Sequence, residues 1–486
     1  MENMEDIMEL SEFKNHIKDK RVSVVGIGVS NVPLIEFLHG CGAKITARDK
    51  KTPEELGGIY EKILPLVEKT ALGEGYLSDI CDDIVFRSPG IRYDIPEFKA
   101  VAEKGAAISS EMELFFSLCP CKIIGITGSD GKTTTTTVTY KILSKQAELD
   151  GGDRRIWLGG NIGSPLIGHI GEIKEDDICV VELSSFQLHT MKSSPCVAAI
   201  TNITPNHLNW HTDMDEYIEA KTHIFTNQTA EGTVVLNYEN DITRALAEKA
   251  KGRVFFFSSK RTPEVDNAVY EENGAIYLKE NGKARKVINT SDIKLVGRHN
   301  VENYMTAIAL TAGLASADAV YDVASTFNGV EHRLEFVREL DGVKYYNGSI
   351  DSSPTRTIAA LSCFTAPVVV ILGGYDKNLD YEPLCGPLYE HAHTAVLTGQ
   401  NAEKIYKALC GHGVPDDFEI IKEPDFEKAV YAAKTAAKPG DVVILSPAAA
   451  SFDHFKNFEE RGKIYKSIVQ SFVGEGSPLP IEEKKK

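Results

Sequence analysis

The sequence has no apolar run approaching the ~20 residues that span a bilayer, and it is poor in positive charge. Its 53 basic side chains are outnumbered by 70 acidic ones, which gives a formal net charge of −17. Because so acidic a surface repels nucleic acid and anionic membranes at long range, neither partner is expected. A polyanionic ligand therefore needs local positive groups, such as backbone N–H groups and a few Lys or Arg side chains.

The cysteines lack a disulfide or metal framework. Nine are scattered over 486 residues, and the one close pair, Cys119 and Cys121 in CPC, suits neither a zinc knuckle nor a CxxC redox pair. An odd number without a framework predicts reduced thiols in a cytoplasmic protein. The first residues, MENMEDIMEL, are acidic where a signal peptide is basic and then apolar, so no such signal is expected.

Short apolar runs rich in β-branched residues recur along the chain, each followed by glycine or polar residues and then a helical pattern. Because this alternation is typical of parallel sheets covered on both faces, it predicts an α/β fold. The length suggests roughly three domains of about 150 residues, placed at residues 1–118, 119–329 and 330–486. The predicted strands lie in RVSVVGIG, AKITARD, DIVFRSPG, KIIGITGS, DICVVELSS, AAITNIT, PVVVILGG, HTAVLTG and DVVILSPAAAS.

A candidate phosphate loop lies in KIIGITGSDGKTTTTT, residues 122–137. The strict pattern has glycine where Ile126 stands, and Gly125 lies one residue further back. Converging backbone N–H groups and the start of the next helix still suit an anion. Lys132 would reach the β/γ-phosphates and Thr133 would hold Mg²⁺. The alternative is an ordinary glycine turn between a strand and a helix.

A second glycine turn, VVGIGVSN, has Gly26 and Gly28, but Asn31 takes the third position of the dinucleotide fingerprint. Asp49 follows at the end of AKITARD, about where an acid binds ribose in such folds. This pattern leaves two alternatives open, a nucleotide-phosphate site or a plain βαβ turn. Lys50 could contact phosphate or be solvated.

Glu182 ends the predicted strand in DDICVVELSSFQL, one strand away from the phosphate loop. A carboxylate there is a suitable Mg²⁺ ligand, since hard cations prefer oxygen; the alternative is an acid beside a helix N-terminus. Farther along, His207 and His211 lie near Pro205, in a loop that excludes a zinc-binding helix. His207 follows a strand end and is the better ligand candidate, whereas His211 is interpreted as structural.

Lys221 lies in a predicted helix whose other members are mostly acidic or apolar, and a surface salt bridge is its simplest interpretation. Together with this helix, the motifs described above form a series that is typical of one protein family. The segments GITGSDGKTTTT, ELSSFQL, NITPNHLNWH, EAKTHIF, GRHNVEN, EHRLEF, GGYDKNLDY and SPAAASFDHFKNFEERG occur in this order across residues 122–462. Together they resemble the Mur ligases, the ATP-dependent amino-acid ligases of peptidoglycan synthesis. VVGIGVSN, RSPGI and LGGNIG extend the resemblance to the N-terminal part.

The resemblance implies three domains: an N-terminal Rossmann-like domain that binds UDP, a central P-loop domain that binds ATP, and a C-terminal Rossmann-like domain that binds the amino acid. It implies two Mg²⁺ ions, the first held by Thr133 and Glu182 and the second near His207. Lys221 aligns with a lysine that CO₂ carbamylates in this family. The ATP-binding residues implied are Gly128, Ser129, Asp130, Gly131, Lys132, Thr133, Thr134, Asn303, Arg333 and Asp351.

The strings ELSSFQL and FKNFEERG most resemble the branch of the family that adds D-glutamate to UDP-N-acetylmuramoyl-L-alanine, and a cytoplasmic monomer is expected. In this branch, Lys377 is the cation expected to anchor the acidic amino acid, although a lysine in an ordinary loop is the alternative. The substrate residues implied are Ser30, Asn31, Asp49, Lys50, Ser88 and Asn161 for the UDP-sugar-peptide, and Arg356, Lys377, Ser451 and Phe458 for the amino acid.

Three positions depart from the family pattern: Gly348 and Asn209 stand where aspartates are usual, and Ile350 stands where many members have a lysine. Asp351 and Arg356 are the nearest residues that could compensate. The alternatives left open are a ligase that adds lysine or diaminopimelate, a folylpolyglutamate synthetase, and a non-catalytic paralogue that binds a nucleotide.

Overall fold

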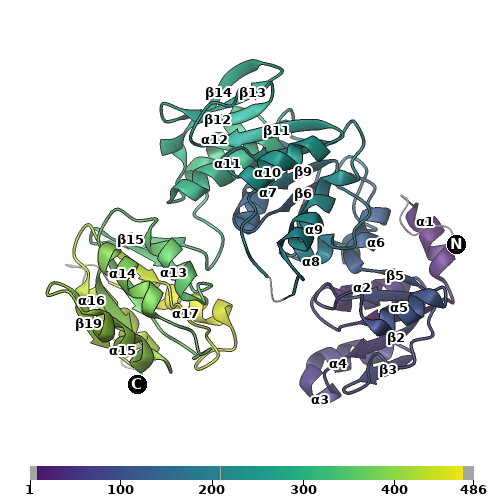
Figure 1. The fold of residues 1–486 in the computed structure, drawn as a ribbon, viewed down its shortest axis with the longest axis horizontal. Coiled ribbons are helices and arrows are strands. Elements are labelled where there is room, and N and C mark those ends of the chain that lie inside the picture. Colours follow the sequence, from purple (N-terminus) through teal and green to yellow (C-terminus); the bar gives the residue numbers. More distant parts are fainter. Residues whose placement is uncertain (1–7, 208–209, 474–486) are drawn as a thin grey trace, which may run out of the picture. The chain divides into compact units, whose positions relative to one another are not determined.

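The protein is described by a computed structural model that covers residues 8–207 and 210–473 (Figure 1). The chain forms two compact units, residues 1–292 with 301–325 and residues 293–300 with 326–486. Each unit is described by itself below. In the residues covered, no helix has the length and apolar character needed to cross a membrane.

The first unit begins with a five-stranded, wholly parallel sheet in the order β3-β2-β1-β4-β5. Successive residues of β1 point to opposite faces: Val24 joins a core with Phe13 and Leu34, whereas Val25 joins another with Phe98. Its elements are α1 (Leu10–Ile17), β1 (Arg21–Val25), α2 (Asn31–Gly40), β2 (Lys44–Asp49), α3 (Pro53–Leu56), α4 (Gly58–Ile63), β3 (Lys69–Leu72), β4 (Ile84–Arg87), α5 (Pro96–Glu103), β5 (Ala107–Ser109) and α6 (Glu111–Leu118).

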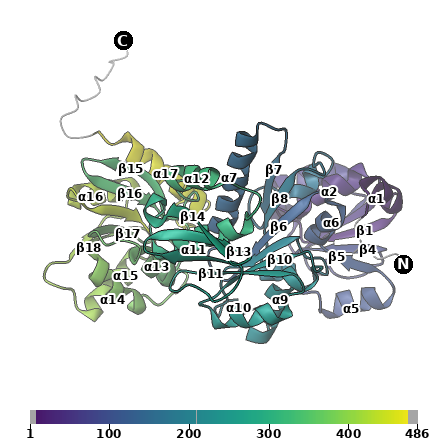
Figure 2. The ribbon, with the colours of Figure 1, turned by 90° about the horizontal axis from the view of Figure 1, so that it is seen from above.

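The same unit contains a nine-stranded sheet in the order β14-β13-β12-β11-β10-β9-β6-β8-β7, with antiparallel pairing only among β12, β13 and β14. The long helix α7 covers one side of this sheet and α9 and α10 cover the other (Figure 2). The strands are β6 (Lys122–Thr127), β7 (Ile156–Gly160), β8 (Ile178–Glu182), β9 (Val197–Ile200), β10 (Thr233–Asn237), β11 (Arg253–Ser258), β12 (Ala268–Glu272), β13 (Ala275–Glu280) and β14 (Lys283–Asn289). The helices are α7 (Lys132–Asp150), α8 (Ser185–Leu188), α9 (Met214–Thr226), α10 (Asp241–Ala245), α11 (Arg298–Leu310) and α12 (Ala317–Thr326).

The second unit has a six-stranded sheet in the order β15-β16-β20-β17-β18-β19, parallel except for β15. Strand β17 is buried on both faces, because Val368 and Val370 join one core and Val369 and Ile371 the other. Its elements are β15 (Glu335–Leu340), β16 (Val343–Asn347), α13 (Pro354–Leu361), β17 (Val368–Leu372), α14 (Glu382–His391), β18 (Ala392–Leu397), α15 (Ala402–His412), β19 (Glu419–Lys422), α16 (Phe426–Ala436), β20 (Val442–Leu445) and α17 (Phe458–Ser471).

The predicted α/β class is confirmed, and each of the nine apolar runs contains a strand. The run AAITNIT is strand only at its start, because β9 ends at Ile200 and the chain then enters a loop. The three sheets fall within the three predicted residue ranges, although the division into three domains stays a prediction.

Candidate functional site

The phosphate-loop candidate connects β6 to α7 at the carboxyl end of the central strands, and two of its glycines are required there. Gly128 has φ +149°, and a Cβ at this position would lie 1.9 Å from Oγ1 of Thr201. Gly131 has φ +79°, and its Cβ would lie 2.5 Å from Oδ1 of Asn303. An L side chain fits neither position, so the backbone comes close to its neighbours only because these residues are glycine.

Lys132 is the first residue of α7. Its ammonium donates to the carbonyl oxygens of Gly128 and Ser129, both at 2.9 Å. Ser129 is buried and anchors the loop, because its hydroxyl donates to the carbonyl of Thr204 at 3.0 Å. The lysine is thus held directly over the loop in which an anion was predicted.

Glu182 ends β8, next to the strand that leads into the loop. Its register partners are Ile126 of β6 and Gly160 of β7. The side chain is 2% exposed, and its Oε1 accepts a hydrogen bond from Nδ2 of Asn161 at 3.1 Å. Oε2 is buried without a hydrogen-bond partner. A buried carboxylate oxygen left without a donor fits a hard cation such as Mg²⁺.

Lys221 of α9 points at the same loop and is 1% exposed. Its Nζ donates to the carbonyl of Gly128 at 2.7 Å and lies 4.6 Å from the ring centre of Tyr217. Burial, and then repulsion from Lys132, hold its pKa well below the usual lysine range. The interpretation as a surface salt bridge is therefore wrong, because Lys221 lies on the buried face of α9.

Neither histidine of NHLNWH lies on a helix, as predicted. His207 is exposed, with φ +55°, and its ring lies 5.0 Å from that of Phe186, which directly follows ELSS. His211 is buried, and its Nε2 lies 2.9 Å from the hydroxyl of Ser185. Burial lowers the pKa of His211 to about 4, so it is neutral, in keeping with a structural role. Asn209 lies outside the described residues.

The segment of α11 in the first unit contributes Asn303 to the loop. Asn303 is buried, and its Oδ1 accepts a hydrogen bond from the hydroxyl of Thr135 at 3.2 Å. Because the same oxygen lies beside Gly131, this residue braces the end of the loop and the start of α7 together. Of the predicted ATP residues, Thr133 and Thr134 lie in the first turn of α7 and Asp130 is exposed on the loop.

The N-terminal glycine turn is organised by the two predicted polar residues that follow it. Asp49 is buried and accepts hydrogen bonds from the N–H groups of Ile27, at 2.6 Å, and Lys51, at 2.8 Å. Asn31 is also buried and donates to the carbonyl of Gly26 at 2.8 Å. Its Oδ1 has no hydrogen-bond partner. Ser30 is half-buried in the same turn, Ser88 is half-buried after β4 and lies beside Gly26, and Lys50 is exposed.

In the second unit, Asp351 takes the space beside Gly348. A Cβ on Gly348 would lie 2.6 Å from Oδ2 of Asp351, and that oxygen accepts a hydrogen bond from Ser446 at 2.9 Å. Burial raises the pKa of Asp351 to about 7, although Arg333 and Arg356 act against the rise. An aspartate side chain at position 348 would thus overlap the space that the side chain of Asp351 fills.

The remaining predicted amino-acid residues lie on loops and at helix starts of the second unit. Lys377 is exposed in the loop after β17, and Arg356 is exposed with its Nη1 donating to the carbonyl of Ile350 at 3.2 Å. Ser451 is buried after β20. Phe458 begins α17 and packs edge-on against the ring of His332, 6.0 Å away.

Two arginines were missed by the sequence reasoning. Arg92 forms a bidentate pair with Glu216, with contacts of 2.8 and 3.2 Å, and so connects the loop between β4 and α5 to α9. Arg461, 2% exposed, donates to the carbonyls of Ser349, Ala449 and Ala450 and so holds two strand-end loops of the second unit together. Arg461 belongs to FKNFEERG, and this motif was the one feature of the sequence that could have identified it as a site residue.

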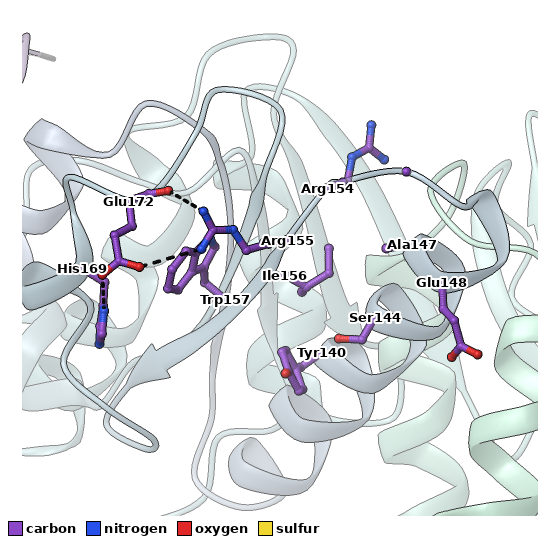
Figure 3. A pocket seen from close by; sticks show the side chains of 11 residues that line it. Tyr140, Ser144, Ala147, Glu148, Arg154, Arg155, Ile156, Trp157, His169 and Glu172 are labelled. Carbon is purple, nitrogen blue, oxygen red and sulfur yellow. Dashed lines mark hydrogen bonds and ion pairs between the residues drawn. The ribbon is translucent and has the colours of Figure 1, made fainter.

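A cleft of about 540 Å³ lies where α7 ends and β7 begins, and it contains none of the predicted site residues. Figure 3 shows Arg155 in this cleft turned toward Glu172, to which it donates at the carbonyl and pairs at the carboxylate, 3.3 and 3.8 Å away. Its cation is therefore already engaged with an acid, and the cleft supports no part of the predicted chemistry.

Comparison with known proteins matches two family models to the chain. Residues 126–311 match the Mur ligase middle domain, and residues 332–449 match the Mur ligase, glutamate ligase domain. The UDP-N-acetylmuramoylalanine–D-glutamate ligase of Acetivibrio thermocellus is 49% identical, covering 95% of this chain and 99% of that protein. The protein of the same name from Clostridium novyi is 48% identical over the same shares.

Solved structures with low sequence identity share the fold. The UDP-N-acetylmuramate–alanine ligase of Thermotoga maritima aligns with a TM-score of 0.55 and 18% identity, covering 93% of this chain and 99% of that one. The MurF ligase of the same organism, solved in complex with ADP, aligns with a TM-score of 0.54 and 16% identity over 97% and 99%. At this identity the likeness shows the fold alone.

Proposed function

This chain belongs to the Mur ligase family, and from that premise we propose that it is the ATP-dependent ligase that adds D-glutamate to UDP-N-acetylmuramoyl-L-alanine in peptidoglycan precursor synthesis. The observation that carries the proposal is the 49% identity, over 95% of the chain, with a relative of that name. The family resemblance inferred from the motifs is thereby confirmed.

The reaction would take place in two steps. The γ-phosphoryl group of ATP passes to the terminal carboxylate of the UDP-sugar-peptide, which gives ADP and an acyl phosphate. The amino group of D-glutamate then attacks the acyl carbon, and the tetrahedral intermediate expels phosphate and leaves an amide. Such chemistry needs positioning and charge neutralisation more than covalent help from the protein.

Lys132 and the loop N–H groups would neutralise the phosphates. The ammonium of Lys132 already lies over the loop, held by carbonyls of Gly128 and Ser129. An incoming phosphate offers stronger, charged acceptors than these carbonyls do. The short contacts therefore hold the lysine ready to bind the β/γ-phosphates.

The acidic and hydroxyl groups beside the loop fit magnesium. Thr133 and Glu182 would hold one ion, and His207, with Lys221 if it is carbamylated, would help to hold a second. Mg²⁺ would supply charge neutralisation for the phosphate oxygens. The buried, unpartnered Oε2 of Glu182 supports this assignment.

Lys221 is suited to carbamylation. Only a neutral amine attacks CO₂, and burial together with the nearby Lys132 lowers the pKa of Lys221. The nitrogen lone pair of the neutral amine forms the N–C bond to CO₂ and one N–H proton passes to solvent, which leaves a carbamate anion with two oxygens. The buried position within reach of Gly128 would then place this anion beside the phosphate loop.

The two buried polar residues at the glycine turn, Asn31 and Asp49, would contact the UDP part together with Ser30, Lys50 and Ser88. Asn161 would contact the muramoyl-peptide part. Lys377 would bind D-glutamate, with Arg356, Ser451 and Phe458 around it. In the second unit, Arg333 and Asp351 would contact ATP. We further propose a monomer in the cytoplasm. The nine cysteines, which are all free thiols, support the location in a reducing compartment.

The proposal is tested by substrate choice. The protein is incubated with UDP-N-acetylmuramoyl-L-alanine, ATP and Mg²⁺, and D-glutamate, L-lysine or diaminopimelate is offered separately; a further reaction offers folate with L-glutamate. Phosphate release that depends on D-glutamate alone is the expected result. Release with another acceptor would identify a different ligase, and no release in any reaction would favour a paralogue that binds without ligating.

A further inference from the structure

Three buried cysteines outside the proposed catalytic site meet at one point. The Sγ atoms of Cys119 and Cys121 are 3.6 Å apart, those of Cys121 and Cys179 are 3.5 Å apart, and those of Cys119 and Cys179 are 3.8 Å apart. The three residues are 6%, 9% and 0% exposed. The sulfurs thus form a nearly equilateral triangle of buried thiols.

The triangle has the dimensions of a metal–thiolate site. Tetrahedral zinc binds cysteine sulfur at about 2.3 Å, which places neighbouring sulfurs about 3.8 Å apart. One ion can therefore contact all three sulfurs with shifts of only a few tenths of an ångström. We propose that Cys119, Cys121 and Cys179 form a binding site for one thiophilic divalent ion of the zinc class.

The sequence alone hides this site, because its third ligand is 58 residues from Cys121. Cys119 directly follows α6, Cys121 directly precedes β6, and Cys179 lies in β8. The parallel pairing of Ile123 with Cys179 brings the start of β6 beside the start of β8. The three thiols consequently gather at the amino ends of the strands, whereas the phosphate loop follows their carboxyl ends.

The chemistry of the cluster suits a cation better than three neutral thiols. Ions of the zinc class bind cysteine as the thiolate, so binding at this cluster releases the thiol protons. The nearest acid, Asp177, is already engaged with Nε1 of Trp157 at 2.9 Å and with the N–H of Lys174 at 3.0 Å. The ion would thus have three sulfur ligands and an open fourth position for water, reached past the slightly exposed Cys121.

Occupation of the site would strengthen the connection between the first two sheets. Cys119 and Cys121 bracket the link from α6 to β6, and Cys179 is fixed within the central sheet. A metal that binds the folded chain but not the unfolded one raises stability with its concentration. The site is therefore a structural clamp that the ligase reaction does not require.

The test is a titration of the intact, reduced protein with Co²⁺ and with Cd²⁺. Bands of thiolate-to-metal charge transfer, and the visible d–d bands of tetrahedral Co²⁺, should saturate at one ion per chain. The Tm should rise in parallel. Magnesium sites made of oxygen ligands give no thiolate band, so the proposed catalytic site does not contribute to this signal.

Cys121 is 9% exposed, and its replacement in Cys121→Ser should abolish the thiolate-to-metal band and the rise in Tm. Cys41→Ser is the matched control at 8% exposure, in the same core and outside the cluster, and should leave both unchanged. Cys385→Ser tests another buried thiol that lies near possible ligands, Glu382 and His412, and should also leave the band and the Tm rise unchanged. No thiolate band in the wild type, or a band lost only in Cys385→Ser, would overturn the proposal.

Discussion

Nζ of Lys221 donates to the carbonyl oxygen of Gly128 at 2.7 Å, so a lysine of α9 is bound to the first residue of the phosphate loop. Such a cation is costly when buried, and its lowered pKa shows that burial disfavours the charge. The proposed carbamate would replace this costly buried cation with an anion beside the loop. The contact therefore leads to a prediction that separates stability from activity.

Lys221→Met is expected to abolish ligase activity while leaving the free energy of unfolding unchanged or higher. Because the folded-state pKa lies below the usual 10.5, the unfolded chain binds more protons in the window between the two values. Wild-type stability should therefore rise with pH toward 10.5, and this rise should be smaller in Lys221→Met. Urea unfolding of both proteins across that pH range measures this difference in the pH dependence of stability.

The carbamate itself is tested with CO₂. Activity of the wild type should fall in CO₂-depleted buffer and return with bicarbonate. Lys145→Ala, at a lysine paired with Glu148 on the outside of α7, should respond in the same way as wild type. Full activity of Lys221→Met would exclude the carbamate.

Glu182→Gln keeps the shape of the side chain and removes its charge. We expect the turnover rate to fall by about 100-fold, the scale for loss of one preorganised electrostatic contact, and the Mg²⁺ concentration for half-maximal rate to rise. Glu219→Gln, at an exposed position of α9, is the control. An unchanged Mg²⁺ dependence would contradict the assignment of Glu182 as a ligand.

Glu216→Gln should destabilise the first unit by about 2 kcal/mol at neutral pH, the scale of hydrogen bonds to charged groups. Hydrogen bonds from Arg92 hold the pKa of Glu216 far below 4.5. The carboxylate therefore stabilises the fold above pH 4.5, and this contribution is lost as pH falls below that value. The stability difference between wild type and variant should shrink in acid.

The exposed pair Arg21–Asp83 provides the comparison for this experiment. Asp83→Asn should cost less than about 1 kcal/mol, because solvent screens the pair. Equal losses in the two variants, measured by urea unfolding, would show that the Arg92–Glu216 contact is an ordinary surface pair.

Gly348→Asp should lower the Tm, since its Cβ would lie 2.6 Å from Oδ2 of Asp351. The double variant Gly348→Asp/Asp351→Gly relieves the clash and should recover the Tm. If Asp351 serves in place of the usual aspartate, the double variant should also recover the KM for ATP, whereas Asp351→Gly alone should raise it. An unchanged KM in Asp351→Gly would remove Asp351 from the ATP site.

Much of the site was readable in the sequence because its signals are local. The phosphate loop requires glycines where the chain must have positive φ, as Gly128 and Gly131 do. The nine apolar runs predicted strands, since a strand covered on both faces is apolar throughout. Glu182 was placed beside the loop because parallel strands end at a common edge.

The tertiary structure decided what depends on long-range contact. Helical periodicity could not show that Lys221 points inward, nor that Arg92 reaches Glu216 across 124 residues. Only strand pairing brought Cys179 to Cys119 and Cys121, and only the close packing around Gly348 coupled it to Asp351. Local sequence sets φ and burial pattern, whereas which side chains meet is fixed by how sheets pair and helices pack.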